Sequence, residues 1–219
     1  MRNALALPAL LVGLNVSALA AQSIDPRTVL KTVFSENVEK EMALSAAPEH
    51  LRAGATVYVF RASGYAKVQT GTNGFTCFVN RDGFFYNSAA FKPTCWDAEG
   101  ATSYVPVMLR VGELLAAGKL LDEIRTDIDA GFKGGKYNRP KRTGVAYMLA
   151  GDVNLDTSTG KILSQAYPSH YMIYAPGVTN GDLGYSREAA QANATLPFIF
   201  RSGAGGGELS YLIIAPQHR

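Results

Sequence analysis

The chain is poor in the residues that most often carry metal binding and nucleophilic catalysis. Among 219 residues it has three histidines, two cysteines and one tryptophan. A zinc site built on thiolates needs more cysteines, or histidines close by, and neither lies near Cys77 or Cys95 in the sequence. The formal net charge is only +3, which disfavours nucleic acid as a partner. We therefore expect no metal, no cofactor and no nucleic-acid partner.

Long apolar runs are also lacking beyond the N-terminus, so we expect no membrane-spanning segment. The chain begins with one positive charge at Arg2, an apolar run from Ala4 to Val16, and the small residues Ala18-Leu19-Ala20. This order is typical of a secretory signal peptide. We predict that residues 1–21 are the signal peptide, that residues 22–219 form a single domain, and that the protein is periplasmic or secreted.

The two cysteines both lie in the predicted exported part. In an oxidising compartment, such a pair favours a disulfide bond between Cys77 and Cys95. Two free thiols with a redox role are the alternative, which the absence of a C-x-x-C spacing disfavours.

Helices are predicted in two regions. Asp25 and Pro26 are typical of a helix start, and apolar residues at helical spacing follow, with a break near Ser35 and an end before Pro48. A second helical pattern begins at residue 105 and is divided at Gly118.

Seven runs have the composition of β-strands: 56–60, 65–70, 75–80, 144–151, 169–176, 196–201 and 209–216. The segment 84–100 is expected to be an irregular excursion that the disulfide holds against the sheet. Strands in runs, with helices grouped before and between them, favour an α+β fold. We predict a mainly antiparallel sheet of about six to seven strands, with helices packed on one side.

Two segments resemble ligand-binding loops without completing the pattern. Residues 152–163 have the alternating oxygens of a calcium loop, but Thr157 stands where glycine is needed and Leu163 where glutamate is needed. A β-hairpin turn is the better interpretation. The glycine-rich segment 202–208 joins two strands, whereas a phosphate loop leads into a helix.

His170 is the main candidate for chemistry. Its strand would direct it to the same side as Met172 and Tyr174. Asp97 and Glu99 follow Cys95 closely, and a histidine beside one or two carboxylates could serve as a general acid/base pair or a metal site. The alternative is that His170 caps a strand and bonds a backbone carbonyl.

Aromatic residues near His170 point to a binding pocket, and the ligand-binding candidates are Tyr174, Tyr147, Trp96 and His50. We predict a binding module for a small polar ligand or a cell-envelope component. The alternatives are a hydrolase or metal-assisted enzyme that uses His170 with Asp97 or Glu99, and a structural envelope protein.

The landmarks "GTNGFTCFVNR", "PTCWDAEG" and "PSHYMIYAPG" resemble an uncharacterised family of secreted bacterial proteins. The resemblance extends from about Ala43 to Pro216 and implies an exported protein with a disulfide. In that family the last landmark often has the pattern His-Pro-His-x-Met-x-Tyr. Here Pro168 and Ser169 precede His170, so the first histidine is absent, which disfavours a metal site with two histidines.

Overall fold

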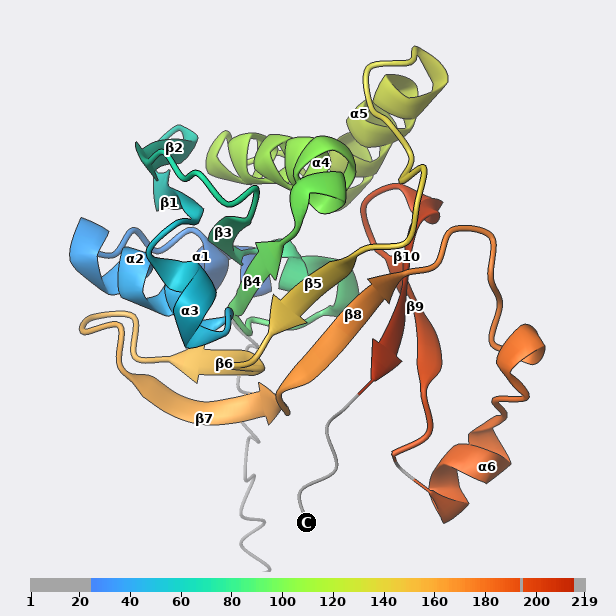
Figure 1. The fold of residues 1–219 in the computed structure, drawn as a ribbon. Coiled ribbons are helices and arrows are strands. Elements are labelled where there is room, and N and C mark those ends of the chain that lie inside the picture. The colour runs from blue at the N-terminus through green and yellow to red at the C-terminus, as the bar shows by residue number, and fades with distance from the viewer. Residues whose placement is uncertain (1–24, 194, 215–219) are drawn as a thin grey trace, which may run out of the picture.

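Figure 1 shows the fold in a computed structural model, which describes residues 25–193 and 195–214. The predicted signal peptide, residues 1–21, lies outside the described residues, as do residues 215 and 216 of the last predicted strand. Within the described part of the chain, no helix has both the length and the apolar composition needed to cross a membrane.

An eight-stranded sheet in the order β2-β1-β3-β4-β5-β8-β10-β9 forms the centre of the fold (Figure 1). All neighbouring pairs are antiparallel except β1 and β3. Its strands are β1 (Thr56–Arg61), β2 (Gly64–Gln69), β3 (Thr76–Asn80), β4 (Lys92–Trp96), β5 (Val145–Met148), β8 (His170–Tyr174), β9 (Phe198–Ser202) and β10 (Gly206–Ile214). Strands β6 (Asp152–Leu155) and β7 (Ile162–Tyr167) form a separate hairpin, so the hairpin interpretation of residues 152–163 is confirmed.

The mainly antiparallel α+β architecture is confirmed, but the predicted count of six to seven strands is wrong. The additional strand is β4, in the segment expected to be irregular. Pro93 disfavoured a strand there, because proline donates no hydrogen bond to a sheet. Tertiary pairing overrides that local preference, since β4 lies between β3 and β5 and pairs with both.

The prediction that helices pack on one side of the sheet is also wrong, because two helices cover opposite faces. Helix α4 (Ala98–Ala116) brings Met108 against Asn80 of β3, whereas α2 (Glu36–Ser45) brings Glu39 against Arg81. Side chains at adjacent positions of an extended chain point to opposite faces. Figure 1 shows α2 and α4 on the two sides of β3 and β4.

The predicted helix breaks are confirmed. Ser35 separates α1 (Pro26–Leu30) from α2, and Gly118, with a φ of +75° that favours glycine, lies between α4 and α5 (Leu121–Lys133). Helix α4 starts earlier than expected, where Asp97 caps it by accepting from the Gly100 amide at 3.0 Å. The remaining helices are short: α3 (Glu49–Arg52), α6 (Arg187–Ala192) and the 3₁₀ turns η1 (Asp82–Tyr86) and η2 (Gly181–Leu183).

The predicted disulfide between Cys77 and Cys95 is present. The two cysteines lie directly opposite each other on β3 and β4. On the same face, the fully buried ion pair between Arg81 and Glu39, with an N–O distance of 2.7 Å, fastens α2 to the sheet. The disulfide therefore ties β3 to β4, and the ion pair ties the turn that follows β3 to α2.

Candidate functional site

A cavity of about 380 Å³ opens on the α4 side of the sheet. It lies between the central strands β3, β4, β8 and β10, the edge strand β9, and the β6–β7 hairpin, with Met108 of α4 as a further wall. Its volume falls within the range of about 300–1,000 Å³ typical of small-molecule sites. Its lining includes the exposed residues Tyr86 and Ala166 as well as the fully buried Trp96. The cavity therefore extends from the surface into the core.

Most of the cavity wall is apolar, with several methionine and aromatic side chains. Unbranched methionine side chains adapt readily to differently shaped contacts, and aromatic rings supply broad flat surfaces. The apolar lining includes Met108, Met148, Met172, Phe198, Phe200 and Ile213. The apolar part of a ligand would therefore leave water and contact hydrocarbon and aromatic side chains, which is favourable.

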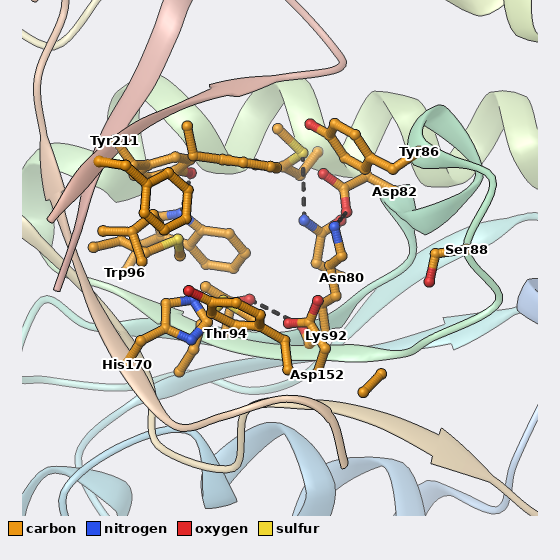
Figure 2. Close-up of a pocket in the computed structure, with 18 residues that line it drawn as sticks. Asn80, Asp82, Tyr86, Ser88, Lys92, Thr94, Trp96, Asp152, His170 and Tyr211 are labelled. Carbon is orange, nitrogen blue, oxygen red and sulfur yellow. Dashed lines mark hydrogen bonds and ion pairs between the residues drawn. The ribbon is translucent and has the colours of Figure 1, made fainter. Parts of the chain in front are cut away.

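The polar groups gather on one side of the cavity. Asn80 and Lys92 are directly opposite in the β3–β4 register, so their side chains emerge next to each other. The Lys92 ammonium lies 3.0 Å from the Asp82 carboxylate, and both side chains are almost fully buried. Figure 2 shows Asn80, Asp82 and Lys92 together, with Trp96, Tyr211 and His170 across the cavity from them.

Asp152, the first residue of β6, adds a second carboxylate to this side. Burial raises its pKa to about 6, while the nearby Lys92 charge lowers it and the Asp82 charge raises it further. No group among the described residues donates a hydrogen bond to this carboxylate. The amide oxygen of Asn80 is likewise buried without a partner in the part of the chain that the structure describes. Unpartnered buried polar atoms are costly, so they favour a site that a ligand completes.

His170 lines the cavity but is engaged with the backbone. Its Nδ1 donates to the Pro168 carbonyl oxygen at 2.8 Å, as the strand-cap interpretation predicted, and its ring meets the edge of Tyr167. Burial lowers the pKa of His170, so the ring is neutral at pH 7. It adds no positive charge to the cavity.

Of the four ligand-binding candidates that the sequence grouped around His170, the structure places only Trp96 in the same cavity. Trp96 lines the cavity, with its indole nitrogen donating to the Tyr211 hydroxyl at 3.1 Å. Tyr174 lies farther along β8, under α4, where its hydroxyl donates to Asp97 at 2.9 Å. Tyr147 packs against Phe75 and Tyr171 on the opposite sheet face. His50 is exposed on α3 and does not line the cavity.

The two carboxylates proposed for catalysis have other partners. Asp97 accepts from the amides of Gly100 and Val145 at 3.0 Å, and so joins the start of α4 to β5. Glu99 accepts from the Lys141 amide and from Arg142. Neither lines the cavity with His170.

The residues that form the polar side were missed because no local pattern joins them. Asn80, Asp82, Lys92 and Asp152 come from four different elements. A signal was present at Lys92, a charged residue in the apolar run "AAFKPTCW", and at Asn80, which shares its strand face with Phe78. Within residues 25–193 and 195–214, no group of three histidine, cysteine, aspartate or glutamate side chains is arranged to hold a metal ion.

Comparison of the chain with protein-family models, with curated proteins and with solved structures finds no match.

Proposed function

We propose that the protein is a binding protein for a small amphiphilic ligand, which it takes into the cavity beside His170. The ligand has an apolar body that fills the space between the methionine and aromatic walls, and a polar end directed at Asn80 and Asp152. The observation that best supports this proposal is a deep apolar cavity with unpartnered polar atoms on a single side.

A hydrolase or metal-assisted enzyme is less well supported. That hypothesis requires Asp97 or Glu99 beside His170, and both carboxylates are hydrogen-bonded outside the cavity. A ligand-binding role needs only the cavity and its polar side.

We also propose that the protein acts in the periplasm or outside the cell. The signal-like N-terminal sequence and the Cys77–Cys95 disulfide support this location, because disulfides persist in oxidising compartments. The resemblance to secreted bacterial proteins points the same way. The ligand is then one that reaches the cell envelope or the medium.

Blocking the cavity mouth tests the binding function. Ala166 is exposed on β7 and lines the opening, so Ala166→Phe places a ring there without crowding the core. We expect the neutral fluorescent probe N-phenyl-1-naphthylamine to bind the native protein with enhanced emission, and the variant to bind it at least tenfold more weakly.

Ile162→Phe is the matched control, because Ile162 is an exposed apolar residue of the same strand that does not line the cavity. It should leave probe binding unchanged. Equal probe affinity in the native protein and in Ala166→Phe would show that the cavity is not the binding site.

A further inference from the structure

We propose that the ligand carries a positive charge, as an alkyl or arylalkyl ammonium group, and that the Asp152 carboxylate is its counter-ion. This inference rests on the proposed binding function and specifies the chemistry of the ligand. It follows from the balance of charges in the cavity and from the hydrogen-bonding groups that remain free there.

The cavity has more negative than positive charge. Among the residues that the structure describes, Lys92 is the only lysine or arginine that lines it, and this cation is already paired with Asp82 at 3.0 Å. The Asp152 carboxylate remains without an ion-pair partner or hydrogen-bond donor among the described residues. His170 is neutral, so one negative charge is uncompensated at neutral pH.

The two unpartnered atoms on the polar side of the cavity are both acceptors, and so have the same polarity as the free charge. The Asn80 amide group donates through Nδ2 to the Met108 sulfur, which leaves its buried oxygen as an unused acceptor. A carboxylate also only accepts hydrogen bonds. Two acceptors without donors match an ammonium group, which has up to three donors and no acceptor.

An anionic ligand fits these groups poorly. It would have to displace Asp82 from Lys92, and would then leave Asp82 and Asp152 both buried without a cation. The aromatic lining also suits a cation, because ring faces attract positive charge. Lys92 already uses this attraction, with its nitrogen 4.5 Å from the centre of the Tyr86 ring.

Binding of a cation should depend on the ionisation of Asp152, whose pKa burial raises to about 6. The groups that act on it are Lys92 on β4, Asp82 on η1, and Tyr86 and Tyr167, whose raised pKa values keep them neutral. His170 on β8 also lines the cavity, and burial lowers its pKa. Ammonium affinity should therefore fall by about tenfold from pH 7.5 to pH 5, where most Asp152 is protonated.

Three ligands of one shape and different charge test this inference: 4-phenylbutylamine, 4-phenylbutanol and 4-phenylbutyrate. Their affinities are measured by displacement of N-phenyl-1-naphthylamine from the folded, disulfide-bonded protein at pH 7.5. We expect the amine to bind at least tenfold more tightly than the alcohol, and the acid to bind most weakly. At pH 5 the amine should lose its advantage over the alcohol.

Asp152→Asn removes the charge while keeping the shape of the side chain, and should reduce the preference for the amine to threefold or less. Asp129→Asn is the control, because Asp129 is exposed on α5 and its loss changes the net charge equally. It should keep the preference. Circular dichroism of both variants confirms that they are folded.

The outcomes separate this inference from the binding function. If the alcohol or the acid binds as tightly as the amine, or if none of the three displaces a probe that Ala166→Phe excludes, the charge preference is wrong and the binding function stands. If the probe also binds Ala166→Phe normally, the binding function itself is wrong.

Discussion

At the scale of single residues, the ionised Asp152 carboxylate lowers the free energy of unfolding of the ligand-free protein. The folded protein surrounds its carboxylate with protein atoms but supplies no hydrogen-bond donor among the described residues. Such a group stabilises the folded state when protonated and destabilises it when ionised. Binding sites commonly retain such locally unfavourable groups, because the ligand supplies the missing partner.

We therefore predict that Asp152→Asn makes the ligand-free protein more stable at neutral pH. The folded pKa of about 6 lies above the ordinary value of 3.8, so the stability contributed by the proton is lost as the pH rises between these values. An asparagine side chain does not ionise, so the variant does not lose stability over this pH range. The variant should gain roughly 1–3 kcal/mol in free energy of unfolding at pH 7.5.

Urea denaturation of both proteins at pH 4.5 and pH 7.5 measures this difference, which should be markedly smaller at the lower pH. A gain that is the same at both pH values would mean that the carboxylate charge is not its cause.

At the scale of elements, the segment from β3 through η1 to β4 forms the polar side of the cavity together with Asp152 of β6. Asn80, Asp82 and Lys92 all belong to it, and the disulfide closes it at its base. The cross-link limits the conformations of this segment in the unfolded chain and ties its two strands together in the folded one. The same bond therefore supports both the sheet and the site.

The double variant Cys77→Ala/Cys95→Ala should lose about 3 kcal/mol in free energy of unfolding. This is the value expected when a disulfide joins two cysteines that are 18 residues apart. The measurement is chemical denaturation of the oxidised native protein and of the variant under the same conditions. A loss below about 1 kcal/mol would show that sheet pairing alone holds β3 to β4.

At the scale of the whole molecule, the cavity lies between the main sheet, including its edge strand β9, and the β6–β7 hairpin. Its two sides come from segments far apart in the sequence, so an occupant contacts parts of the molecule that must separate on unfolding. A ligand of this cavity binds only the folded protein and stabilises it by mass action.

At a concentration 100 times its dissociation constant, 4-phenylbutylamine should raise the melting temperature of the native protein by about 5–10 °C. Differential scanning fluorimetry at pH 7.5 checks this, with Ala166→Phe measured beside it. An equal rise in that variant would place the stabilising contact outside the cavity.

The sequence by itself determined the parts of the fold that depend on local signals. A β-rich composition predicts seven strands of the main sheet, namely β1, β2, β3, β5, β8, β9 and β10. Ser35 and Gly118 predict the helix breaks. The disulfide followed from the number of cysteines. Composition and spacing act over a few residues, so they are readable without knowing which segments meet.

Only the tertiary structure decided which side chains share the cavity. Pairing of β4 with β3 and β5 overrode the local effect of Pro93, and it turned Lys92 and Trp96 to the same face as Asn80. The approach of the β6–β7 hairpin then added Asp152 beside them. His170 and Trp96 do line one cavity, while Asp97 caps α4 instead, because sequence proximity to Cys95 does not determine the direction in which a side chain points.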